Sequence, residues 1–180
     1  MVGKARVLRK LEGITYWVIE DPEEIRELVC DNIRKEWEAD IAEQKDHESG
    51  RWLASIRTRR WGLGAIEMTR IKLNPAVMNY GNKETGYDFR KRLQERKVIL
   101  ERDLDRYGAV IRPLVIRDED MQLMDGYCRY HVFQDRKVKR ALAYLGSLVP
   151  TERDRFRRRK GSIAVSAWGR PSPYRATANP

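Results

Sequence analysis

Apolar residues recur every four positions in the stretch that follows Asp21. Asp21 and Pro22 are typical of a helix start, because aspartate caps the first turn and proline fits its first position. The sequence therefore predicts an amphipathic helix over residues 22–48. Its apolar stripe consists of Ile25, Val29, Ile33, Trp37 and Ile41. Such a stripe packs either against the chain's own sheet or against a second copy, which would give a homodimer through this helix.

The second half of the chain alternates between strand-like and helix-like patterns. A strand is predicted over residues 66–73, with a bulge near Thr69 where the alternation slips by one position. A helix is predicted over 87–108 and ends at Gly108. Its inner face is predicted to consist of Leu93, Leu100, Leu104 and Tyr107. Short apolar or β-branched runs predict strands over 110–118, 121–124 and 141–146, and a helix over 127–139 precedes the last strand.

The order strand, helix, strand, strand, helix, strand predicts the α+β class, with one small mixed sheet. We expect a helical N-terminal arm over 1–65, the α+β domain over 66–148 and a basic, partly disordered tail over 149–180. A length of 180 residues fits one domain with such appendages.

Composition narrows the class of protein further. Hydrophobic residues make up 41% of the chain and charged residues 36%. There is no apolar run of about 18 residues and no signal-peptide pattern at the N-terminus, so we expect no membrane association. The two cysteines, Cys30 and Cys128, need not pair, which fits a reducing cytoplasm. His47 and His131 have no metal-ligand spacing, and no metal site is expected.

The net charge of +10 lies mostly in the tail. Residues 151–180 hold eight Lys and Arg against Glu152 and Asp154, a net charge of +6. The densest part contains Arg155, Arg157, Arg158, Arg159 and Lys160. Such a cationic segment suits nucleic acid, through sequence-independent contacts to backbone phosphates. The alternative is a tail that only increases solubility.

A second arginine-rich stretch, RWLASIRTRRWGLG over residues 51–64, interleaves tryptophan with arginine. Arg57, Arg59 and Arg60 are candidates for phosphate contacts, with a neighbouring tryptophan ring stacking on a base. The alternative is a short helix that is anchored by its tryptophans, has a solvated basic face and is broken by Gly62 and Gly64.

The run MQLMDGYCRYH at 121–131 is the strongest candidate for chemistry. A strand, Asp-Gly and a helix in that order place Gly126 at a helix N-terminus, where free N–H groups favour an anion. Arg129 lies in the first turn, where its guanidinium can close over a phosphate. Asp125 can orient that arginine, hold a metal on the phosphates or cap the helix. Tyr127, Cys128 and Tyr130 can instead be packing residues, and an ordinary turn is the alternative.

The segment RYGAVIRPLVIRDEDMQLMDGYCRYHVFQDRKVKRALAYLG resembles the nucleotide-binding module of the ParB/sulfiredoxin superfamily. That module has a helix ending in glycine, two strands, and a Gly-x-x-Arg signature that opens a helix. The resemblance implies a ParB/sulfiredoxin-like fold whose nucleotide-binding residues are Gly126, Tyr127, Cys128, Arg129 and Tyr130. It also implies a nucleoside triphosphate, ATP or CTP, as cofactor, with or without Mg²⁺.

Departures from the superfamily's patterns limit the activity. Sulfiredoxins carry their catalytic cysteine directly after the glycine, where this chain has Tyr127, so sulfinic acid reduction is rejected. Free serine kinases show a similar Asp-Gly-x-x-Arg-Tyr pattern. Their catalytic glutamate, however, follows the first strand directly, and Glu84 comes several residues later. Asp125 and Glu84 are nevertheless the catalytic candidates. Unlike ParB proteins, the chain has no room after residue 146 for a helix-turn-helix.

Two hypotheses follow. The first is a ParB-like nucleotide-binding protein that acts on or near nucleic acid through its basic tail. The second is a nucleotide-dependent kinase of a small hydroxyl compound, so enzymatic activity stays open.

Overall fold

The computed structural model describes residues 6–32, 56–83 and 86–149. Residues 1–148 form one compact unit, and 149–180 belong to a separate one. The central element is a four-stranded sheet with the strand order β3-β8-β6-β7. Its strands are β3 (Arg60–Glu67), β8 (Arg140–Ser147), β6 (Leu114–Arg117) and β7 (Gln122–Asp125). β6 and β8 are parallel and the other two pairs antiparallel, so the sheet is mixed and the predicted α+β class is confirmed.

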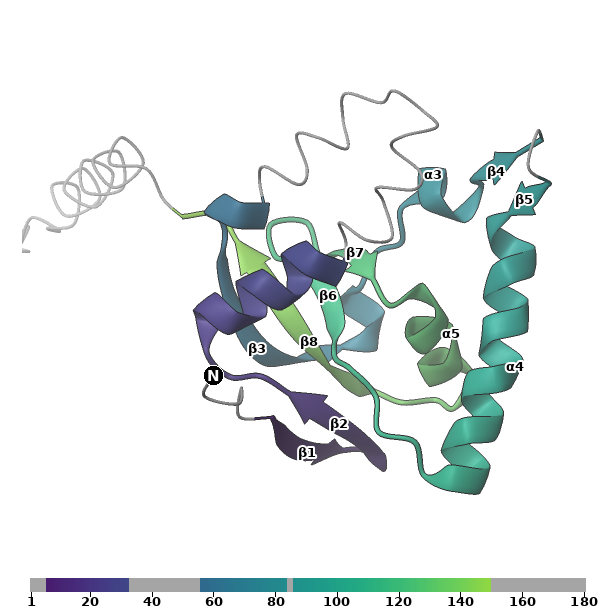
Figure 1. Ribbon diagram of the computed structural model, residues 1–180, viewed down its shortest axis with the longest axis horizontal. Helices are drawn as coiled ribbons and strands as arrows, with labels where there is room; N and C mark the ends of the chain where they lie inside the picture. Colours follow the sequence, from purple (N-terminus) through teal and green to yellow (C-terminus); the bar gives the residue numbers. More distant parts are fainter. Residues whose placement is uncertain (1–5, 33–55, 84–85, 150–180) are drawn as a thin grey trace, which may run out of the picture. The chain divides into compact units, whose positions relative to one another are not determined.

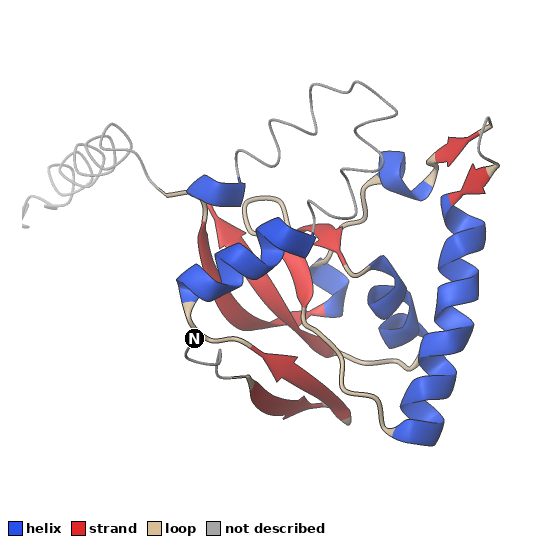
Figure 2. Cartoon of the chain, viewed as in Figure 1, coloured by secondary structure: helices blue, strands red, loops and turns tan. Residues whose placement is uncertain are grey.

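The sheet is covered on both faces, as the alternation of its buried side chains shows. Figures 1 and 2 show how the strands and helices are arranged. Leu114 and Ile116 of β6 pack in a core with residues of the helices α4 (Phe89–Tyr107) and α5 (Tyr127–Asp135). Val115, between them, packs on the opposite side with Ile25 and Val29. Because successive residues of a strand point to opposite faces, one short strand contributes to both cores.

The stripe that predicted the 22–48 helix therefore packs, where it is described, on the chain's own sheet. Residues 22–32 are helical, and Asp21 Oδ1 accepts hydrogen bonds from the N–H groups of Glu23 (3.0 Å) and Glu24 (2.9 Å). Ile25 and Val29 are almost completely buried. These two residues are thus not available to a second copy, whereas Ile33, Trp37 and Ile41 lie outside the described residues.

A hairpin at the N-terminus, which the sequence did not predict, completes the core. It consists of β1 (Val7–Leu11) and β2 (Ile14–Val18). Glu12 and Gly13, both with positive φ, form its tight turn. Ile14, Tyr16 and Val18 face the main core. The expected helical arm thus begins with strands that belong to the compact unit.

The first predicted strand is shifted in the structure. β3 begins at Arg60 rather than at residue 66, so the predicted domain boundary falls within it. In place of the expected bulge at Thr69, the strand gives way to a 3₁₀ turn, η1 (Met68–Arg70). Three short elements follow: α3 (Pro75–Met78), β4 (Gly81–Asn82) and β5 (Tyr87–Asp88).

The predicted helix over 87–108 is confirmed as α4. Asp88 Oδ1 accepts hydrogen bonds from the N–H groups of Arg90 (2.9 Å) and Lys91 (3.2 Å), and Gly108 ends the helix in the left-handed region at φ 57°. Leu93, Leu100 and Leu104 face the core as expected. The prediction for Tyr107 is wrong, because its side chain is exposed. None of the helices in the described ranges has the length and apolar character needed to cross a membrane.

Candidate functional site

The sequence Asp125-Gly126 joins β7 directly to α5. Gly126 has φ 100° and ψ 26°, a conformation that residues other than glycine rarely adopt. A Cβ at this position would also lie 2.8 Å from Cδ2 of Leu114 and 3.0 Å from Nη2 of Arg129. Both the backbone turn and the close packing therefore require glycine.

The first turn of α5 begins without a side-chain cap. The first helical hydrogen bond runs from the N–H of Tyr130 to the carbonyl oxygen of Gly126 (2.8 Å). The N–H groups of Tyr127, Cys128 and Arg129 precede it, and N–H groups at these positions have no partner within a helix. Such an arrangement favours an anion in general, and anion binding at this helix start stays a prediction.

Arg129 makes three hydrogen bonds inside the protein, and of these the sequence suggested only the one to Asp125. Its Nη1 donates to the carbonyl oxygens of Arg112 (2.8 Å) and Pro113 (2.6 Å). Its Nη2 donates to Oδ2 of Asp125 (3.1 Å), and the side chain is only 12% exposed. Arg129 thus fastens the start of α5 to the segment before β6. Closing its guanidinium over a phosphate would require an exchange with Asp125.

The two tyrosines of the signature are core residues. The hydroxyl of Tyr127 donates to the carbonyl oxygen of Leu123 (3.1 Å) and accepts from the N–H of Asn74 (3.3 Å). Its ring meets Phe89 edge-on. The hydroxyl of Tyr130 accepts from Nε2 of Gln134 (2.7 Å). Burial raises the pKa of both phenols. Any contact of these residues with a phosphate would therefore come from the backbone.

Cys128 is half-buried and forms no disulfide. Burial raises the pKa of its thiol, and the opposing influence of Arg129, Arg96 and Lys97 is smaller. A thiol with a raised pKa is a poor nucleophile at neutral pH. The geometry therefore agrees with a packing role for Cys128.

The structure describes one of the two catalytic candidates, Asp125. The carboxylate of Asp125 is 17% exposed and bonded to Arg129. Glu84 lies outside the described residues. The described ranges also contain no cluster of three or more His, Cys, Asp and Glu side chains that could hold a metal ion. The kinase hypothesis stays a prediction, and no contact in the described residues favours it.

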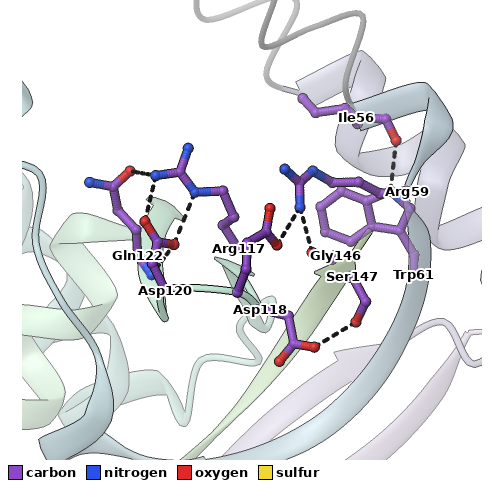
Figure 3. Close-up of polar contacts among 10 residues, drawn as sticks. Ile56, Arg59, Trp61, Arg117, Asp118, Asp120, Gln122, Gly146 and Ser147 are labelled. Atoms are coloured by element: carbon purple, nitrogen blue, oxygen red, sulfur yellow. Dashed lines mark hydrogen bonds and ion pairs between the residues drawn. The ribbon is translucent and has the colours of Figure 1, made fainter. Parts of the chain in front are cut away.

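Arg59 was predicted to bind nucleic acid, but it is a buried structural residue. Its Nη1 donates to Oε2 of Glu119 (2.6 Å) and to the carbonyl oxygen of Gly146 (2.9 Å; Figure 3). Only 5% of its side chain is exposed. Arg57 and Arg60, by contrast, are exposed. The prediction for Arg59 is therefore wrong, and those for Arg57 and Arg60 stay open.

The ring of Trp61 cannot stack on a base, because it is buried against the end of β8. Its Nε1 donates to the carbonyl oxygen of Ile56 (3.0 Å; Figure 3). A Cβ at Gly146 would lie 2.7 Å from the ring, so glycine is needed there to admit the indole. The alternative interpretation of this stretch, a tryptophan anchor, fits Trp61. It does so as part of a strand rather than of a helix.

A polar cluster around the β6–β7 turn was not recognised in the sequence. Arg117 donates to both carboxylate oxygens of Asp120 (2.9 and 2.6 Å) and to Oε1 of Gln122 (2.7 Å; Figure 3). Ser147 Oγ donates to Oδ2 of Asp118 (2.7 Å). The hydrogen bond from Arg117 lowers the pKa of Asp120. The only sequence signal was RDED between two strands, which specifies no partners.

The tail residues Arg155, Arg157, Arg158, Arg159 and Lys160 lie outside the described residues. Their predicted contact with nucleic acid therefore stays a prediction.

No family model matches the chain, and no curated protein matches it. Two solved structures of a pNOB8-like ParB N-domain are similar to it. They have TM-scores of 0.36 and 0.35 and sequence identities of 13% and 14%, and cover 64% and 62% of this chain. The matched part spans only 40% and 35% of those chains.

Proposed function

We propose that this chain binds a nucleoside triphosphate, ATP or CTP, with the phosphates at the N-terminus of α5. The observation that carries the proposal is the geometry of Gly126, which opens a helix in a left-handed conformation without a side-chain cap. The N–H groups of the first turn and the positive end of the helix dipole both favour a phosphate oxygen there.

Arg129 supports the proposal because its guanidinium is already held in position before an anion binds. Two backbone carbonyl groups fix its guanidinium next to Gly126, so little side-chain entropy is lost when an anion arrives. Asp125 is its charged partner within the described ranges, through a hydrogen bond of 3.1 Å. A triphosphate carries more negative charge than one carboxylate and can compete for Nη2. Asp125, once displaced, is the carboxylate next to the phosphates and could hold a Mg²⁺ that arrives with them.

We further propose that the protein acts on or near nucleic acid, with the tail supplying affinity. The support is charge alone, because residues 151–180 carry a net charge of +6. With Arg59 excluded, Arg57 and Arg60 are the exposed arginines among the described residues of the 51–64 stretch, and they can add phosphate contacts.

The nucleotide proposal is tested by thermal unfolding with ATP, CTP and inorganic triphosphate, each with and without Mg²⁺. A ligand that binds the native state at about 100 times its Kd contributes about 2.7 kcal/mol, which raises the Tm of a domain of this size by roughly 5–10 °C. Arg129→Ala should lose most of this ligand-induced shift. The shift is compared with that variant's own unliganded Tm, because Arg129 also fastens α5.

Arg136→Ala is the matched control, since Arg136 lies at the other end of α5 and contacts Asp105 and Glu101. It should keep the full ligand-induced shift. A flat panel with the wild-type protein, or an equal shift in Arg129→Ala, would contradict the proposal.

A further inference from the structure

The helix α4 carries a second apolar position on the side that faces away from the core. Its buried side consists of Leu93, Leu100 and Leu104. On the opposite side Val98 is 59% exposed and Ile99 is 50% exposed. Two adjacent large aliphatic residues with half of their surface in water, on an otherwise regular amphipathic helix, are typical of a contact surface.

Charged residues flank this apolar pair in a defined order. Glu95 and Arg102 lie one turn before and one turn after it, so positions 95, 98, 99 and 102 form one diamond on the helix surface. Their present ionic contacts are weak surface pairs: Arg92 Nη1 lies 4.0 Å from Oε2 of Glu95, and Arg102 bonds to the adjacent Asp103. Exposed pairs of this kind contribute little and can be exchanged for other partners.

We propose that this diamond is the contact between two copies of the chain, with the two α4 helices antiparallel about a two-fold axis between Val98 and Ile99. A two-fold contact is formed by the same patch on both copies. In the antiparallel arrangement Val98 meets Ile99 of the second copy, and Glu95 meets Arg102 at both ends of the diamond. The parallel arrangement would bring Glu95 to Glu95 and Arg102 to Arg102, which repel. The charges therefore favour a second copy of the chain as the partner, with its α4 helix antiparallel to the first.

The same symmetry limits the extent of the contact. One turn further out, Lys91 would meet Arg106 of the second copy, and both residues are exposed cations. This repulsion confines the contact to the central turns, so the helices cross rather than run side by side. The buried area is then small and the association weak. This surface is distinct from the 22–48 helix, whose Ile25 and Val29 are buried in the chain's own core.

The test is sedimentation velocity on the full chain over a concentration series from about 5 to about 500 µM, the range in which small interfaces associate. The weight-average mass of the wild-type protein should rise from 21.3 kDa toward twice that value. Glu95→Arg should weaken association about tenfold or more, because a cation at position 95 would meet Arg102 of the second copy. The double variant Glu95→Arg with Arg102→Glu restores opposite charges and should associate like the wild type.

Gln94→Arg is the control, since position 94 is exposed on α4 but lies outside the diamond. It should associate like the wild type. A wild-type mass that stays at 21.3 kDa throughout would overturn the proposal. Association that persists unchanged in both Glu95→Arg and Ile99→Lys would overturn it as well, because the interface would then lie elsewhere.

Discussion

At the scale of single residues, the pKa of His131 in the helix α5 is shifted by its surroundings. Its Nε2 is buried and has no hydrogen-bond partner in the described part of the chain. Burial lowers the pKa of the imidazole, and the nearby ammonium of Lys97 lowers it further, against a smaller opposite effect of Asp135. A protonated ring would place an unsatisfied N–H and a second cation in the α4–α5 contact.

His131 therefore predicts that the free energy of unfolding depends on pH. Because the folded state holds the pKa below its ordinary value of about 6.5, the unfolded chain binds more protons in this range. Stability should decrease as the pH falls through about 6.5 and continue to fall until the lower folded pKa is passed. Urea unfolding at about pH 8 and about pH 5, on either side of the ordinary histidine pKa, measures the difference. His131→Gln should make the dependence shallower; an unchanged dependence would show that other groups cause it.

At the scale of elements, the β6–β7 turn is fastened to the end of β8 and to the start of β3 through Arg59. One guanidinium nitrogen serves both the Glu119 carboxylate and the Gly146 carbonyl group. Burial raises the pKa of Glu119, but the hydrogen bond from Arg59 and the other favourable contacts together outweigh it, so the pKa is lowered overall. The segment before β3 is thereby tied to two strands far away in the sequence.

Arg59→Ala should accordingly destabilise the protein, by about 2 kcal/mol, because it breaks a partly buried ion pair and removes the side-chain donor to the Gly146 carbonyl group, which keeps only the N–H of Asp118. Denaturant unfolding measures the loss. The matched control is Arg60→Ala, which removes an exposed side chain and should change stability by less than about 0.5 kcal/mol. Equal effects of the two substitutions would contradict the structural role of Arg59.

The elements that the sequence predicted well are those with local signals. The helix α4 has a capping aspartate, a regular apolar face and a terminal glycine within one continuous stretch, from Asp88 to Gly108. Residues 60–65 were misread because Gly62 and Gly64 suggested a broken helix, whereas β8, which pairs with them, lies far later in the chain. The hairpin over 7–18 had a usable signal in the alternation of Ile14, Tyr16 and Val18.

In the candidate site, too, the features that the sequence predicted are those with a local signal. The placement of Gly126 between a strand and a helix follows from neighbouring residues and was predicted. The two backbone partners of Arg129 were not predicted, because carbonyl groups such as those of Arg112 and Pro113 leave no mark in a sequence. The Arg59–Glu119 pair was missed for a related reason, since its two residues lie 60 positions apart.

At the scale of the whole molecule, most of the net charge lies outside the compact unit that holds the candidate site. Deleting residues 151–180 removes a net charge of +6. We expect this deletion to weaken nucleic-acid binding and to make the slope of log K against log[salt] shallower, by about 0.9 for each phosphate that the tail neutralises. Gel-shift titrations at several salt concentrations measure both quantities.

The control for the tail deletion is the double variant Arg57→Ala with Arg60→Ala, which removes two exposed cations of the compact unit. It should reduce the slope by no more than about 1.8, because these two side chains can neutralise at most two phosphates. An affinity and a slope that are the same with and without the tail would rule out the tail as the source of binding.

The N-terminal hairpin has a consequence for how the chain folds during synthesis. The N–H of Ile19 donates to the hydroxyl of Tyr144 (3.0 Å), 125 residues away, and the N–H of Lys139 donates to Glu12, 127 residues away. The ribosome therefore releases the apolar face of Ile14, Tyr16 and Val18 long before β8 exists to receive it. Folding is slow when it depends on contacts between such distant residues, and apolar surface stays exposed and prone to aggregation until they form. The hairpin is thus made early and is among the last segments to reach its native position.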